Sequence, residues 1–197
     1  LDPERVKGME GALAYAPLPG WRASVTLFWN RLDDAISNVT IAANTRQRQN
    51  VDAIRSRGIE MEAMGTLGEW RLSASYSRID PRVRASGAAT ALAGLRPAQT
   101  PRDQGSVQLE WNRPGTARAG VTARYIGRQF EDDQNSRRLR DALTFDAVAS
   151  VVLGGGLTAE VRAENLADRL VEATVGADGT IERATPRTLW VALRYVR

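Results

Sequence analysis

Two runs of neighbouring carboxylates are the residues of this 197-residue chain most suited to chemistry, Asp33-Asp34 and Glu131-Asp132-Asp133. Adjacent carboxylates can act as an acid–base pair or bind Ca²⁺ through their oxygens. Grouped charges of this kind are also common on solvated loops. We favour solvated loop charge for both runs, and we predict neither a catalytic residue nor a metal site.

Several residue types that catalysis commonly uses are missing from the chain. It contains no His and no Cys, and the absence of His removes Ser-His-Asp triads, His metal sites and His general bases. The Gly-rich run Leu153–Leu157 resembles a phosphate-binding loop only superficially, because it joins two predicted strands and lacks the Lys and Ser/Thr of a P-loop. We interpret it as a turn and expect no enzyme and no cofactor.

The charge of the chain also limits its partners. All 27 basic residues are arginine except Lys7, and the formal net charge is +4. The arginines are spread over the whole chain among 23 carboxylates and form no continuous basic stripe. This distribution argues against a nucleic-acid-binding protein.

The elements that carry these residues alternate apolar and polar side chains with a period of two. In Trp21–Trp29 every odd position is apolar and the even positions are mostly polar, as in a strand with one apolar and one polar face. No segment reaches the roughly 18–20 apolar residues of a transmembrane helix. The predicted strands are 6–15, 21–37, 48–64, 69–79, 103–111, 117–129, 139–152, 157–166 and 187–196.

The connections between these strands alternate in length. Short Gly- and Pro-rich turns at 16–20, 65–68, 112–116 and 153–156 alternate with longer polar stretches at 38–47, 80–102, 130–138 and 167–186. Short turns at one rim and long loops at the other are typical of outer-membrane barrels. We therefore predict an all-β fold, an antiparallel meander of about nine membrane-spanning strands.

The two faces of the predicted strands support a barrel wall. Charged residues on one face suit a water-filled lumen, where they can form cross-strand ion pairs with a structural role. The predicted lumen-facing residues are Glu60, Glu62, Arg71, Arg118, Arg124, Glu160, Arg162, Glu164 and Arg194.

Aromatic residues near the strand ends predict two girdles at the membrane interfaces. Trp21 and Trp29 are eight residues apart, about 26 Å along a strand, or about 20 Å of height after tilting, close to the ~25 Å apolar band of such barrels. The predicted girdle residues are Trp21, Trp29, Trp70, Trp111, Tyr125 and Tyr195.

Nine strands cannot close into an all-antiparallel barrel, and bacterial single-chain barrels have even strand numbers. We therefore expect residues 1–197 to be the C-terminal portion of a larger barrel, with the earlier strands outside this sequence.

Five motifs in order along the chain resemble the C-terminal barrel half of the TonB-dependent outer-membrane receptors. Each motif is short, but the ordered set covers nearly the whole chain. The motifs are Leu1-Asp2-Pro3-Glu4 with Glu10-Gly11, Thr26–Ile36, Gln49-Asn50-Val51 with Arg57–Glu62, Val161–Asp168, and Pro186-Arg187-Thr188.

The resemblance implies a barrel of about 22 strands in the bacterial outer membrane. It also implies energised import of a scarce ligand, typically a ferric siderophore, cobalamin or haem. The implied partners are outer-membrane lipid, that ligand, and the TonB complex, which is reached through a plug domain absent from this sequence. Family members usually end in an aromatic residue, whereas Arg197 stands at that position here.

The same resemblance implies ligand contacts in the long loops, shared with the plug. Arg128 could bind an anionic siderophore through a bidentate fork, and Phe130, Asp132 and Asp133 lie in the same loop. Three alternatives remain: a passive porin or autotransporter wall, a soluble β-sandwich binding module, and a barrel enzyme, which the absence of His disfavours. The composition of the loops does not separate a siderophore from a cobalamin-like ligand.

Overall fold

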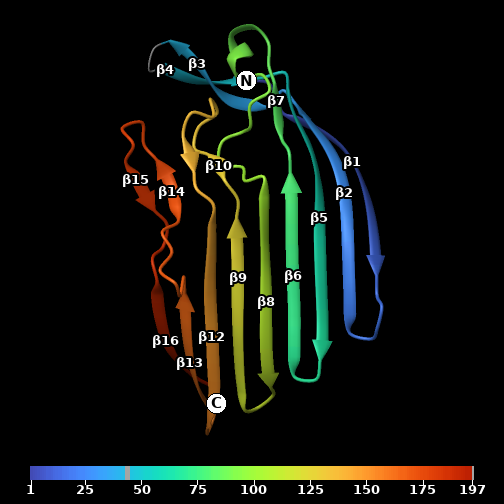
Figure 1. Ribbon diagram of the computed structural model, residues 1–197, viewed down its shortest axis with the longest axis vertical. Helices are drawn as coiled ribbons and strands as arrows, with labels where there is room; N and C mark the ends of the chain where they lie inside the picture. The colour runs from blue at the N-terminus through green and yellow to red at the C-terminus, as the bar shows by residue number, and fades with distance from the viewer. Residues whose placement is uncertain (43–44, 197) are drawn as a thin grey trace.

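The computed structural model describes residues 1–42 and 45–196, and its main feature is one curved antiparallel sheet (Figure 1). Nine long strands follow one another in chain order across this sheet, so the predicted meander is confirmed. Arg197 lies outside the described residues. The nine strands are β1 (Arg5–Tyr15), β2 (Trp21–Asp33), β5 (Ala53–Leu67), β6 (Trp70–Ile79), β8 (Asp103–Arg113), β9 (Ala117–Ile126), β12 (Ala142–Gly154), β13 (Leu157–Glu164) and β16 (Thr188–Tyr195).

The strand ends differ from the predictions at the rim that carries the long loops. The predicted strand 21–37 is wrong beyond Asp33, because Asp34 adopts a left-handed conformation (φ 57°) that breaks the extended chain. The predicted strand 48–64 is likewise wrong at its start, because residues up to Asn50 pair back onto β3. The described residues of the loop predicted at 38–47 therefore belong to β3 and β4, which pair with each other.

Short elements occupy all four long connections, where the sequence patterning is too brief to predict them. They are β3 (Ile36–Ala42), β4 (Thr45–Asn50), β7 (Arg82–Arg84), the 3₁₀ helix η1 (Gly87–Leu92), β10 (Gln129–Phe130), β11 (Arg138–Leu139), β14 (Glu172–Val175) and β15 (Ile181–Arg183). Within the described residues, no helix has the length and apolar character needed to cross a bilayer.

The predicted segregation of turns and loops is confirmed. The tight turns lie together at the lower rim in Figure 1, called the turn rim below, and the long connections lie at the opposite loop rim. Gly20, Gly68 and Gly115 in these turns have positive φ values of 80°, 58° and 70°, which glycine adopts at little cost.

The sheet has one polar and one apolar face. The polar face lines a hollow of about 880 Å³, with Glu62, Ser106, Thr122 and Arg124 among its lining residues, and is therefore the concave one. The opposite, outward face is apolar yet exposed: 60% of Leu27 and 79% of Val191 are accessible. No second sheet covers that face within the described residues, so the sandwich alternative does not apply.

Gly58 marks a close approach of backbone and side chain on the polar face. A Cβ there would collide with the carbonyl oxygen of Arg78 and lie 2.5 Å from Cζ of Phe28, whose ring rests on the glycine. At Gly120 in β9, which also lies on the polar face, the nearest neighbour of a Cβ would be the carbonyl oxygen of Leu109 at 3.5 Å, an ordinary van der Waals contact.

We therefore expect Gly58→Ala to destabilise the protein made from its complete coding sequence by about 1–3 kcal/mol, because a backbone oxygen cannot move aside. Gly120→Ala is the matched control on the same face and should destabilise the protein by no more than about 0.5 kcal/mol. Urea unfolding in detergent micelles, followed by tryptophan fluorescence, measures both. Equal midpoints for the two variants would contradict the packing argument.

Candidate functional site

Hydrogen bonds join the long connections at the loop rim into one layer. This loop layer comprises the described residues of 34–52, 80–102, 127–141 and 165–187. Asp133 links three of these connections: one carboxylate oxygen accepts the N–H of Asn38 at 3.2 Å and the other accepts the N–H of Ala98 at 3.1 Å. The β9–β12 connection thus holds its two neighbours in fixed positions.

Further bonds from the same connection reinforce this arrangement. The side chain of Asn135 accepts a hydrogen bond from the N–H of Arg96 at 3.0 Å and donates one to the carbonyl oxygen of Arg96 at 2.8 Å. Gln134 donates through Nε2 to Oγ1 of Thr40 at 3.1 Å. Each contact joins residues far apart in sequence, so the layer forms only when the whole wall is assembled.

The last long connection joins the layer through two arginines. Arg137 donates through Nη1 to the carbonyl oxygen of Val175 at 2.9 Å. Arg140 donates to buried Glu172 twice, through Nε at 2.5 Å and through its backbone N–H at 2.7 Å. Burial would raise the pKa of Glu172, but these bonds outweigh it and lower that pKa.

A small apolar core lies beneath one part of the layer. Its residues come from the β3–β4 hairpin, β7 and η1, which bury them against one another between the hydrogen-bonded segments. The buried members are Ala35, Val39, Val51, Val83, Ala89 and Leu92.

Asp132 in the β9–β12 connection is buried and hydrogen-bonded rather than solvated. Only 3% of Asp132 is exposed, and it accepts the Ser136 hydroxyl at 2.5 Å and the N–H groups of Ser136 and Arg137 at 3.0 Å each. The prediction of solvated loop charge is wrong for Asp132, because its oxygens close a tight turn. Within the described residues, no three Asp or Glu side chains are grouped to hold a metal ion.

Arg128 and Phe130 remain more available than the two aspartates. Arg128 is exposed and donates through Nε to Asp141 at 2.9 Å, a bond that raises the pKa of Arg128. The half-buried ring of Phe130 lies 5.9 Å from the guanidinium carbon of Arg138. The structure therefore places all four predicted ligand residues in one connection, with the oxygens of Asp132 and Asp133 already hydrogen-bonded.

The nine predicted lumen residues share the polar face, as the cross-strand register requires. Arg118 lies 3.9 Å from Glu160, and Arg162 lies 4.0 Å from Glu160 and 3.8 Å from Glu164. Arg124 pairs with Asp146, which was absent from the predicted set. Within the described residues, the ion-pair ladder is partial, because it leaves out Glu60, Glu62, Arg71 and Arg194.

The predicted girdle aromatics lie near the two ends of the outward face. At the turn rim, Trp70 stands directly opposite Trp111, whose indole N–H donates to Glu69 at 2.7 Å. Trp21 and Tyr195 lie at the same rim, and Trp21 covers Gly65. Trp29 and Tyr125 lie in the halves of β2 and β9 nearer the loop rim.

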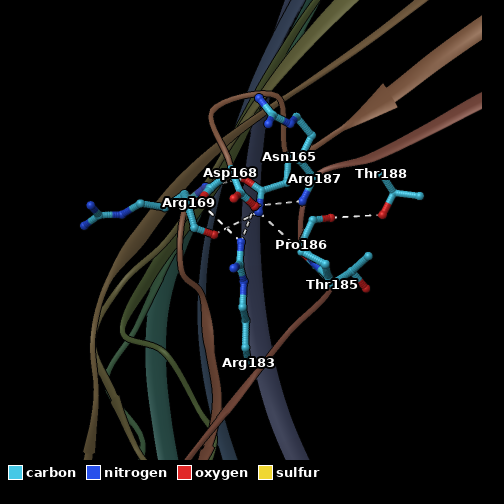
Figure 2. Close-up of polar contacts among 8 residues, drawn as sticks. All are labelled: Asn165, Asp168, Arg169, Arg183, Thr185, Pro186, Arg187 and Thr188. Atoms are coloured by element: carbon cyan, nitrogen blue, oxygen red, sulfur yellow. Dashed lines mark hydrogen bonds and ion pairs between the residues drawn. The ribbon is translucent and has the colours of Figure 1, made fainter.

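A clamp built on Asn165 and Asp168 holds the entry to the last strand (Figure 2). Asn165 is buried with φ 48°, and its side chain accepts the N–H of Arg169 at 2.8 Å and donates to the Arg169 carbonyl at 2.8 Å. Asp168 accepts the N–H of Arg187 at 3.0 Å and binds the guanidinium of Arg183. The Arg187 bond is the largest cause of the lowered pKa of Asp168.

This clamp was not among the predicted site residues. The motif Val161–Asp168 was visible in the sequence, but only as a resemblance. The partners of Asp168 are Arg183, at the end of β15, and Arg187, beyond the β14–β15 hairpin, which sequence reasoning could not place.

Replacing Asp133 tests the loop layer. Asp133→Ala removes the acceptor for two backbone N–H groups, so the amides of Asn38 and Ala98 should exchange faster, with opening free energies lowered by about 1–3 kcal/mol. Hydrogen–deuterium exchange with mass spectrometry measures this on peptides that cover 34–52 and 80–102. Glu182→Ala, at an exposed position in β15, is the control and should leave both peptides unchanged; unchanged exchange in Asp133→Ala itself would refute the linking role.

The Asp132 turn should depend on pH. Burial would raise the pKa of Asp132, but the Ser136 hydroxyl and the N–H groups of Arg137 and Ser136 outweigh it and lower that pKa. Because the pKa of Asp132 is lower in the folded state, its ionised carboxylate stabilises the turn at pH values above the unfolded pKa of about 3.9. This stabilisation is lost as the pH falls through the folded pKa. Amide protection in 127–141, corrected for intrinsic exchange, should therefore persist down to about pH 4 and decline below it. Asp132→Asn should be less protected already at pH 7 and should lack this transition.

Comparisons with known proteins agree with this geometry. Residues 1–166 match the family model described as TonB dependent receptor-like, beta-barrel. The ferrioxamine receptor of Yersinia enterocolitica is 26% identical over 204 residues, a match that covers 90% of this chain and 28% of that receptor. The chain therefore spans little more than a quarter of that receptor's length.

Solved structures show the same fold at low sequence identity. The ferric yersiniabactin uptake receptor FyuA of Yersinia pestis has a TM-score of 0.81 at 17% identity, over 98% of this chain and 30% of FyuA. The siderophore receptor PiuA of Acinetobacter baumannii has a TM-score of 0.80 at 16% identity, over 99% of this chain and 29% of PiuA. The copper transporter OprC scores 0.78 at 16% identity, over 98% of this chain and 32% of OprC, so the fold is not tied to one ligand. On the family match, the chain belongs to the TonB-dependent receptors and forms part of their β-barrel.

Proposed function

We propose that this chain forms barrel wall and outer loops of a receptor in the bacterial outer membrane that takes up a ferric siderophore. The observation that carries the proposal is the loop layer, in which four connections are hydrogen-bonded together at one rim of a polar wall. Loops held in fixed positions on a rigid wall can present side chains to a ligand. The remaining wall strands and the plug, with its TonB contact, are proposed to come from chain outside these residues.

The ligand is proposed to meet the loop layer at Arg128 and Phe130. An exposed guanidinium can bind the carboxylate or hydroxamate oxygens of a chelate, and the accessible part of an aromatic ring offers an apolar contact. Asp132 and Asp133 are proposed to act indirectly, because their oxygens organise the connection that carries the other two residues. The name of the ferrioxamine receptor makes a ferric siderophore the first candidate over a cobalamin-like ligand.

Uptake of radioactive iron as ferrioxamine B tests this function. A strain that lacks other siderophore receptors and carries the complete coding sequence should accumulate the iron, and an uncoupler of the proton-motive force should abolish uptake. Arg128→Ala with Phe130→Ala should raise the half-saturating concentration about tenfold or more, because the contacts proposed for binding are lost. Arg22→Gln, an exposed arginine near the turn rim, should not change it.

Two outcomes would contradict the proposal. Uptake that persists with the uncoupler would indicate a passive pore. Uptake of cyanocobalamin in place of any ferric siderophore would assign the receptor to the other ligand class.

A further inference from the structure

Four basic residues face one another across four neighbouring strands at the loop rim. The cross-strand register places Lys7 opposite Arg31, Arg31 opposite Arg55, and Arg55 opposite Arg82. Directly opposed residues of antiparallel strands project from the same face, so the four cations form one row. We call these residues the basic row.

The basic row projects from the outward face. Arg31 lies two and four positions after Trp29 and Leu27 in β2, so it projects from the same face as these two apolar residues. The polar, concave face carries the intervening residues of the same strands, such as Glu60 in β5. The side chain of Lys7 is 74% exposed. In the proposed outer-membrane location, the outward face that carries the row faces lipid.

The charge of the row is only partly balanced. Asp33 lies 3.6 Å from Lys7 and 2.5 Å from Arg31, and Asp80 lies 3.1 Å from Arg82. Arg55 is exposed and has no carboxylate within 4 Å among residues 1–42 and 45–196.

Arg57 extends this unbalanced charge toward the middle of the wall. It stands directly opposite Trp29 on the outward face, is exposed, and pairs with no carboxylate in the described part of the chain. Like charges placed opposite each other destabilise a sheet, so the row favours an external anion.

The height of the row indicates which anion fits. Arg31 follows Trp29 by two residues, about 7 Å along the strand, so the cations lie just beyond an aromatic of the predicted interfacial girdle. Lipid headgroups lie at that level, and guanidinium groups bind phosphate through two parallel hydrogen bonds.

Among the described residues, the turn rim offers no equivalent row. Arg113 is the outward arginine beside Trp111 there, and Glu69 lies 3.7 Å from it. The unbalanced positive charge on the outward face thus belongs to the loop rim.

We propose that the basic row, with Arg57, binds the phosphate groups of anionic lipid in the leaflet at the loop rim. The proposal rests on the membrane location given above. A second copy of the chain fits less well, because a symmetric contact would place these cations against each other. The lipid anchors the wall at a defined height, and its phosphates supply the negatively charged partners that Arg55 and Arg57 lack.

Lipid titration of the purified receptor, made from its complete coding sequence, tests the proposal. Lipid A, phosphatidylcholine and inorganic phosphate are each titrated into receptor in dodecyl maltoside micelles, with tryptophan fluorescence as the readout. We expect saturable binding of lipid A that weakens with salt, because phosphate–guanidinium attraction is screened. Arg55→Gln with Arg57→Gln should weaken this binding about tenfold or more, and phosphatidylcholine should show no such difference.

The matched control changes two arginines that point away from lipid. Arg22→Gln with Arg194→Gln removes the same charge from the polar face and should leave lipid A binding unchanged. Heat-modifiable mobility on a gel checks that each variant is folded, and Arg57→Gln alone replaces the double variant if that one fails to fold.

Three results would overturn the proposal: equal lipid A affinity in both double variants, binding of phosphatidylcholine as tight as that of lipid A, or inorganic phosphate binding as tightly as the lipid. Ferrioxamine uptake is measured separately on the same variants. Absence of ferrioxamine uptake with intact lipid A binding would count against the proposed function alone. Absence of lipid A binding with intact uptake would count against the lipid site alone.

Discussion

The continuous cross-strand ladder from β1 to β16 is the constraint on which the rest of the structure depends. It pairs the backbone N–H and C=O groups within the sheet, so the wall does not need a conventional apolar core to satisfy them. Because successive side chains alternate between faces, one register decides the surroundings of every residue in the wall. A slip by one position would turn Glu62 outward and Met61 into the polar hollow.

The loop layer depends on this wall and stabilises itself by a different interaction. Asp133 and Asn135 bond to backbone groups of other connections, so the wall must first bring the strand ends together. Buried carboxylates such as Asp132 and Glu172 are retained because each has several donors. This ordered layer fixes the positions of side chains at one rim of the wall.

Arginines serve two different purposes on the two faces. On the polar face, Arg118 and Arg162 have carboxylates of the wall within 4 Å. On the outward face, Arg55 and Arg57 have none in the described residues, although neighbouring cations crowd them. The same residue type therefore stabilises the wall internally in one place and favours an external anion in the other.

Strand number, strand order and the separation of turns from loops followed from the sequence, because alternation over ten residues and Gly-rich turns are local signals. The same signals predicted which charged residues share the polar face. The tertiary structure alone decided the course of the long connections, because elements such as β7 and η1 are short and the side chains of Asp133 and Asn135 bond to other connections. It also decided that Asp132 is buried, that Asn165 and Asp168 clamp the start of β16, and that four cations meet in one row. The basic row depends on the register of neighbouring strands, and the Asp132 turn and the clamp depend on side-chain hydrogen bonds that close within a connection; alternation of apolar and polar residues records neither.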